Sequence, residues 1–113
     1  MHEYSIVQAL VERVDTEARA RRAIAVHRLS VRIGELSGVE VGLLTTAYAT
    51  FRERTVCEGA ALDVQIVPAR WVCPDCGDPI GRGNPLRCRA CDVPARLAEG
   101  DEIMLDRIEM EVP

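Results

Sequence analysis

The sequence contains no lysine, few aromatic residues and no long apolar run. All 14 basic residues among its 113 are arginines, and 18 acidic residues give a net charge of −4 at pH 7. Proteins that bind phosphate backbones need a basic face, so this balance argues against nucleic acid as a partner. The apolar runs are far shorter than the roughly 20 residues that cross a bilayer, which excludes a membrane span. The chain also starts without a secretory signal, so we expect a cytoplasmic protein.

Catalytic motifs are missing as well. With only two histidines, His2 and His27, the chain has no plausible Ser/His/Asp or Cys/His set. The stretch Gly81–Gly83 is a turn signal and has none of the spacing of a phosphate-binding loop. We therefore expect that the protein is not an enzyme.

Hydrophobic periodicity in the first third predicts a helix followed by a strand. Apolar residues recur at steps of three and four over residues 4–20, which is typical of an amphipathic helix. Residues 24–33 alternate as a half-buried strand does. The apolar face of that strand is predicted to hold His27, Leu29, Val31 and Ile33. We interpret His27 as a packed, hydrogen-bonded histidine in preference to a metal ligand.

The next elements are a second helix and two more strands. Ser37 and Glu40 have the spacing of a capping box, which predicts that a helix over roughly 39–54 follows. Alternation predicts strands over 62–66 and over 104–112. The apolar parity of the last strand comprises Met104, Ile108, Met110 and Val112.

Residues 70–98, between these last two strands, hold four prolines and almost no apolar periodicity. A segment of about thirty residues cannot bury enough surface to fold without a staple. We therefore expect the last strand to return to the sheet of the first two. The predicted fold is α+β, with a main domain of residues 1–69 plus 99–113 and an inserted metal-binding domain of residues 70–98.

Four of the five cysteines form two Cys-x-x-Cys pairs, separated by eleven residues. The pairs are Cys73 with Cys76 and Cys88 with Cys91. Four thiolates in this pattern suit tetrahedral zinc and leave no open position for substrate, so the predicted zinc is structural. An iron site with the same ligands, a redox dithiol and disulfides are the alternatives. Gly77 follows the first pair, where a positive φ is wanted, and Asp92 follows the second.

The N-terminus carries a second possible metal site. The α-amine of Met1, the amide nitrogen of His2 and the imidazole of His2 can close adjacent chelate rings on one ion. The amide of Glu3 or another ligand can supply a fourth donor, and such nitrogen-rich square-planar sites suit Ni(II) or Cu(II). By itself this pattern is weak, since most histidines at position 2 have no such role. The fifth cysteine, Cys57, is interpreted as a small half-buried hydrophobic residue.

Three stretches together resemble the HypA/HybF family, the nickel-delivery proteins of [NiFe]-hydrogenase maturation. They are MHEYSI from Met1, VRIGELSGVE ending at Glu40, and the two Cys-x-x-Cys pairs, in the order that the family has them. The resemblance implies a nickel-binding domain with two helices on a three-stranded sheet, joined to a zinc-ribbon-like domain. It also implies nickel bound through Met1, His2 and Glu3, with Glu3 using its backbone amide.

The resemblance implies a role for Glu40 and a set of partners. As a residue beside the metal-bound histidine, Glu40 would accept the other imidazole N–H, although its capping role competes with this. Similar proteins work with a HypB-type GTPase and deliver nickel to the large-subunit precursor of [NiFe]-hydrogenase, and some also serve urease and its accessory proteins. Residues 70–113 lack the extra histidine that some relatives use for nickel.

The leading hypothesis is therefore a nickel metallochaperone with Zn(II) as permanent scaffold and Ni(II) as cargo. The alternative is a zinc-ribbon adaptor that binds nucleic acid or a protein partner. The arginines of the 70–98 segment favour the alternative, whereas the acidic total and the absence of lysine oppose binding to phosphate.

Overall fold

The computed structural model describes residues 2–113. In chain order its elements are α1 (His2–Ala20), β1 (Ala25–Gly34), α2 (Val41–Phe51), β2 (Ala61–Val67), β3 (Arg70–Val72), β4 (Pro79–Ile80), β5 (Arg96–Glu99) and β6 (Ile103–Glu111). The strands form two three-stranded sheets, with the orders β2-β1-β6 and β4-β3-β5. The predicted α+β fold, two helices on a three-stranded sheet with an inserted zinc-ribbon-like unit, is confirmed.

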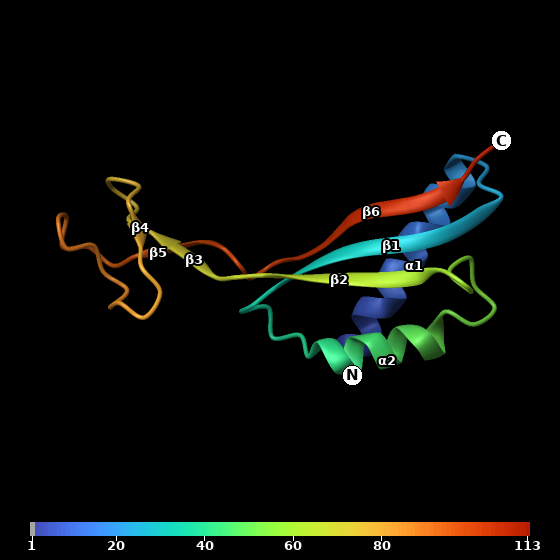
Figure 1. Cartoon of the computed structure of the whole chain (residues 1–113), viewed down its shortest axis with the longest axis horizontal. Helices are drawn as coiled ribbons and strands as arrows, with labels where there is room; N and C mark the ends of the chain where they lie inside the picture. The colour runs from blue at the N-terminus through green and yellow to red at the C-terminus, as the bar shows by residue number, and fades with distance from the viewer. Residues whose placement is uncertain (1) are drawn as a thin grey trace.

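The first sheet is mixed because α2 lies between two of its strands in the chain. β1 and β2 run parallel, which requires a crossover connection, and α2 supplies it. β6 returns from the second sheet and pairs with β1 antiparallel, as the sequence predicted. Both helices pack on one face of this sheet (Figure 1).

The core lies between the helices and that face of the sheet. It is aliphatic, as the scarcity of aromatic residues requires. Its fully buried large side chains include Val7 and Val14 of α1, Leu29 and Ile33 of β1, and Leu44 of α2. Cys57 is also fully buried, which agrees with its interpretation as a hydrophobic residue, although it is buried more deeply than expected.

Both helices differ from prediction at their ends. α1 begins at His2, two residues before the predicted start. α2 begins only after Glu40, which has extended backbone angles and accepts a hydrogen bond on its carboxylate from the Leu43 N–H at 2.6 Å. Glu40 is thus the N-cap itself, and the predicted capping box with Ser37 as the cap is wrong. The helix ends at Phe51, before the predicted end near residue 54. Arg54 has a φ of 63°, a left-handed conformation that a right-handed helix cannot include.

The first of two bulges moves His27 out of the apolar face. The register of β1 against β6 shifts between Val26 and Arg28, so His27 is an extra residue in β1. An extra residue reverses the face that the following side chains take. Val26 and Leu29 are therefore both buried while His27 is exposed, and its nearest acidic partner is Glu111 at 3.5 Å. The prediction of a packed His27 is wrong.

The second bulge acts in the same way on β6. Here Asp106 is the extra residue, because Ser30 pairs with Arg107 and Val31 pairs with Leu105. Leu105 consequently packs against the core, whereas Met104 is 46% exposed. The prediction that Met104 belongs to the apolar face of this strand is wrong for the same physical reason as for His27.

The second sheet projects from one end of the first, so the molecule is elongated (Figure 1). Its principal extents are 55 × 30 × 16 Å. Two chain crossings join the sheets, one between β2 and β3 and the other between β5 and β6. No helix within residues 2–113 combines the length and apolar character that a membrane span requires.

Candidate metal centres

The four paired cysteines meet at one point of the second sheet. Cys73 follows β3 directly, and the second pair lies in the loop between β4 and β5. Their Sγ atoms all lie within 4.8 Å of one another, and the sulfurs of Cys76 and Cys88 are 3.8 Å apart. Four sulfurs around a zinc ion at about 2.3 Å are separated by about 3.8 Å, so this donor set fits zinc.

Backbone geometry explains why the sulfurs converge. In each pair the residue after the second cysteine donates its N–H to the carbonyl of the first, Gly77 to Cys73 and Asp92 to Cys88, both at 2.9 Å. These turns need a left-handed residue, and the φ angles of Gly77 and Asp92 are 78° and 53°. The conformations expected of both residues are confirmed. The N–H groups of Cys76 and Cys91 then point at the sulfurs of Cys73 and Cys88, at 3.4 and 3.5 Å.

Electrostatics show why the cluster needs a cation. The N–H of Cys76, above all, lowers the pKa of Cys73 to about 7, so this thiol ionises near neutral pH. Contacts with the other sulfurs, first that of Cys76, raise the pKa of Cys91 to about 12. A thiolate at one position thus opposes ionisation of its neighbours. A metal ion that balances this charge would favour the thiolate form of all four.

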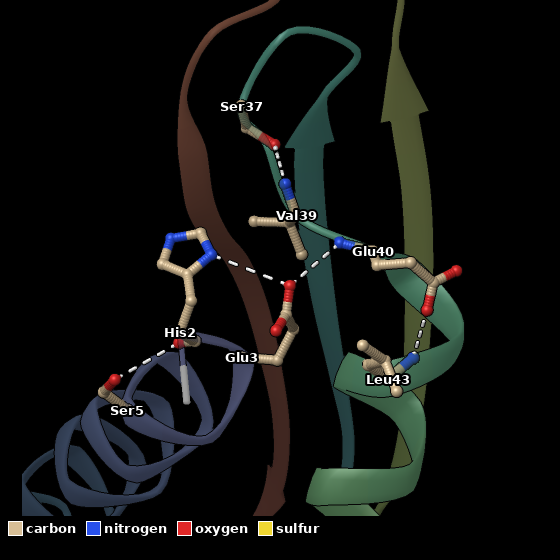
Figure 2. A network of polar contacts seen from close by, with 7 residues as sticks. All are labelled: His2, Glu3, Ser5, Ser37, Val39, Glu40 and Leu43. Atoms are coloured by element: carbon tan, nitrogen blue, oxygen red, sulfur yellow. Dashed lines mark hydrogen bonds and ion pairs between the residues drawn. The ribbon is translucent and has the colours of Figure 1, made fainter.

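The N-terminal residues form a different arrangement at the start of α1. Met1 lies outside the described residues, so its predicted role as a ligand stays a prediction. The side chain of His2 is 56% exposed, and its Nδ1 lies 3.6 Å from Oε2 of Glu3 (Figure 2). Glu3 is 8% exposed overall, so its carboxylate is covered while the neighbouring imidazole faces solvent.

A hydrogen bond from a distant segment fixes the Glu3 carboxylate. Its Oε2 accepts the backbone N–H of Glu40 at 3.1 Å, across 37 residues of sequence. This bond is the main cause that lowers the pKa of Glu3, with smaller contributions from its own N–H and from His2. Glu3 is consequently ionised at neutral pH and presents a negative charge beside the imidazole. The family resemblance implied only a backbone role for Glu3, and the acidic residue next to the histidine was the one signal in the sequence for a side-chain role.

Glu40 takes part in this site through its backbone. Figure 2 shows its carboxylate turned towards Leu43, on the far side of Glu3 from the imidazole of His2. Ser37, which was expected to cap the helix, instead accepts the N–H of Val39 at 3.3 Å within the preceding loop. The carboxylate that faces His2 in the structure is that of Glu3, and a contact between the Glu40 side chain and a metal-bound His2 stays a prediction.

The remaining candidates lie away from both centres. His27 is at the start of β1, whereas the loop to Glu40 leaves from its other end. Cys57 is buried beside Tyr48, whose hydroxyl donates to the carbonyl of Ala60 at 2.9 Å. Burial raises the pKa of the Cys57 thiol, as expected of a thiol surrounded by apolar atoms.

Comparison with known proteins agrees with this geometry. Residues 1–110 match the family described as "Hydrogenase/urease nickel incorporation, metallochaperone, hypA". The chain is 38% identical to the hydrogenase maturation factor HypA of Shewanella baltica over 113 residues, covering 98% of this chain and 97% of the relative. It is also 38% identical to HypA of Aquifex aeolicus over 114 residues, covering 99% of each.

Solved structures give the same result. The solution structure of a HypA protein superposes with a TM-score of 0.81 at 32% identity, covering 97% of this chain and 96% of the other. The solution structure of the nickel metallochaperone HypA from Helicobacter pylori superposes with a TM-score of 0.75 at 30% identity, covering 98% of each chain. Because the family model matches residues 1–110 and the relatives agree in sequence and fold over nearly the whole chain, this chain belongs to the HypA family of hydrogenase and urease nickel-incorporation metallochaperones.

Proposed function

We propose that this member of a nickel metallochaperone family binds Ni(II) at its N-terminus and delivers it to the large subunit of [NiFe]-hydrogenase. Nickel is then the cargo, and zinc held by the four cysteines is permanent. The observation that carries the proposal is the exposed imidazole of His2 beside the covered, ionised carboxylate of Glu3. This places a nitrogen donor and a negative charge at the very start of the chain.

The chelate follows from the chemistry of the first residues. The α-amine of Met1 and the amide and imidazole nitrogens of His2 close adjacent rings on one ion, and the amide of Glu3 supplies a further donor. Only Nδ1 of an imidazole lies near enough to its own backbone amide to close such a ring, and Nδ1 is the nitrogen that faces Glu3. The first N–H groups of a helix have no acceptor inside it, so the amides of His2 and Glu3 are not committed to helix bonds.

An exposed site made from one short segment suits a carrier. A recipient protein can approach His2 directly, because more than half of its side chain faces solvent. Ligands that follow one another in the chain can be replaced one at a time, so release needs no unfolding of the domain. Delivery, on this proposal, takes place in the cytoplasm with a HypB-type GTPase and the hydrogenase large-subunit precursor as partners. The family description also names urease, so urease accessory proteins are proposed as further partners.

The proposed zinc, unlike the nickel, is a structural ion that the protein does not exchange. Cys73, Cys76, Cys88 and Cys91 would hold it, and it would supply a cross-link for a sheet too small to be stable alone. Four protein ligands leave no position for substrate. We propose residues 70–98 as the zinc-binding domain and residues 1–69 plus 99–113 as the nickel-binding domain. The division into two sheets supports this, although β5 extends one residue further, to Glu99.

The decisive experiment compares the native chain with a chain that carries one extra N-terminal residue. The extension keeps every side chain but moves the α-amine away from the chelate, so equilibrium dialysis should show loss of about one bound nickel. His2→Ala should have the same effect. Zinc content should stay unchanged in both variants. His27→Ala is the matched control, because it removes the other exposed histidine and should leave nickel binding intact. Unchanged nickel binding by the extended chain and by His2→Ala would contradict the proposal.

A further inference from the structure

The segment Gly34–Leu36, which leaves β1, touches both chain crossings between the two sheets. The N–H of Glu35 donates to Val67 at 2.8 Å, at the end of β2, and the N–H of Leu36 donates to Gly100 at 2.7 Å, just after β5. The backbones are packed closely here. A Cβ on Gly34 would lie 2.3 Å from the carbonyl carbon of Gly100, which leaves room for no side chain.

The side chain of Glu35 extends this contact into the second sheet. Its Oε1 accepts the N–H of Ala69 at 2.7 Å, on the crossing that leads to β3. Its Oε2 accepts a hydrogen bond from the guanidinium of Arg82, which lies between β4 and the second cysteine pair, 47 residues along the chain. Within residues 2–113 this is the one ion pair that joins the unit carrying the cysteine cluster to the unit of the first sheet. The ion pair between Arg70 of β3 and Glu99 of β5 lies within the second sheet.

We propose that Glu35 is a positioning residue that, through Arg82, fixes the orientation of the cysteine-bearing sheet relative to the first sheet. Beyond the backbone hydrogen bonds at the two crossings, the second sheet projects as a long arm (Figure 1). A small rotation at the crossings therefore moves the far end of this arm widely. The two oxygens of Glu35 hold this arm at two points, one on the crossing and one on the arm itself. The same segment continues to Glu40, whose N–H holds Glu3. This role goes beyond the proposed nickel transport and does not depend on which metal is carried.

Residual dipolar couplings of the zinc-loaded protein, measured by NMR without nickel, test the inference. In the wild type the couplings from both sheets should fit one alignment tensor. Arg82→Gln and Glu35→Gln remove the ion pair. In each of these variants the alignment of the second sheet should fall by roughly a third or more relative to the first, because a rotating arm averages its couplings. Arg82→Lys keeps the charge and should restore most of the alignment. An exposed pair is also screened by salt, so 1 M NaCl should act on the wild type as Arg82→Gln does.

Arg89→Gln is the matched control, since Arg89 is an exposed arginine of the same unit and forms no ion pair among the described residues. It should leave the single tensor intact. Zinc content and amide dispersion show that each variant is folded. Two independent tensors in the wild type would overturn the proposal. Identical tensors in the wild type and Arg82→Gln would do so too, as would equal loosening by Arg89→Gln. None of these outcomes bears on nickel binding, which the N-terminal extension tests separately.

Discussion

The cysteine cluster and the N-terminal site offer opposite surroundings to a metal ion. The cluster draws four sulfurs from two loops and buries two of them, Cys73 and Cys88. The N-terminal site uses neighbouring residues of one segment, and its imidazole is mostly exposed. Ligands from separate loops release an ion only if the loops come apart, whereas ligands from one segment can be exchanged singly. The proposed division of roles, with one ion retained and the other exchanged, rests on this difference.

Removing the zinc should produce the largest effect. Chelation, or Cys88→Ser, should unfold the second sheet, because β3, β4 and β5 are too short to form a core without the cross-link. The first sheet should stay folded, since its core lies between α1, α2 and β1. Two-dimensional NMR should show collapsed amide dispersion for 70–98 only. Cys57→Ala, a cysteine outside the cluster, should retain the zinc. A native spectrum for the zinc-free second sheet would contradict the structural role.

Gly100→Ala should be the next most damaging change and acts at the junction of the two regions. Gly100 has a φ of 111°, and a Cβ there would lie 2.5 Å from the Cα of Ala69. Strain and collision together should cost about 3 kcal/mol. Urea denaturation of the zinc-loaded protein measures this loss. Gly38→Ala is the control, because Gly38 also has a positive φ but its Cβ would meet no atom within 4 Å. Equal losses in both variants would show that the close approach is unimportant.

Glu3→Gln and Glu40→Gln separate the roles of two carboxylates near the proposed nickel site. Glu3→Gln removes the negative charge beside the nickel-binding Nδ1 of His2 while keeping an oxygen for the Glu40 N–H. The Coulomb attraction for Ni(II) is then weaker, so nickel affinity should fall about tenfold. Glu40→Gln keeps a cap for Leu43 and should change affinity by less than about threefold. Calorimetric titration with Ni(II) at pH 7 measures both. A larger loss for Glu40→Gln would instead support the predicted contact between the Glu40 side chain and His2.

A smaller effect is the pH dependence of the free energy of unfolding that comes from Cys57, the cysteine outside the cluster. Burial raises the pKa of Cys57, so the folded protein keeps this proton at a pH where the unfolded chain loses it. The contribution to stability is complete below the ordinary thiol pKa of about 8.5 and declines above it, by at most about 1.4 kcal/mol per pH unit. The raised pKa of Tyr48 extends the decline to higher pH. The difference between the urea midpoints of the zinc-loaded protein at pH 7 and pH 9.5 measures this decline. Cys57→Ala should make that difference smaller. An unchanged difference between the two midpoints would exclude Cys57 as the source of the pH dependence.

Features that depend on neighbouring residues could be predicted from the sequence. The turns at the two Cys-x-x-Cys pairs require a left-handed residue after each pair. Gly77 and Asp92 stand at those positions and adopt that conformation. The helical and strand periods are equally local, and both helices and the three strands of the first sheet formed near their predicted ranges. The bulges at His27 and Asp106 could not be predicted, because an extra residue is visible only when two strands are paired.

The apolar periods and the cysteine spacing determined the fold class and the place of the cysteine cluster, since these follow from neighbours along the chain. The N-terminal candidate site, by contrast, came from the resemblance to the HypA/HybF family. Tertiary structure alone decided which distant groups meet, both at the N-terminal site and between the two sheets. Glu40 reaches Glu3 across 37 residues, and Arg82 reaches Glu35 across 47. Such contacts depend on how α1 packs against the loop before α2, and on how the crossings orient the second sheet. The physical reason is that a hydrogen bond between distant residues requires a geometry that only the packed core supplies.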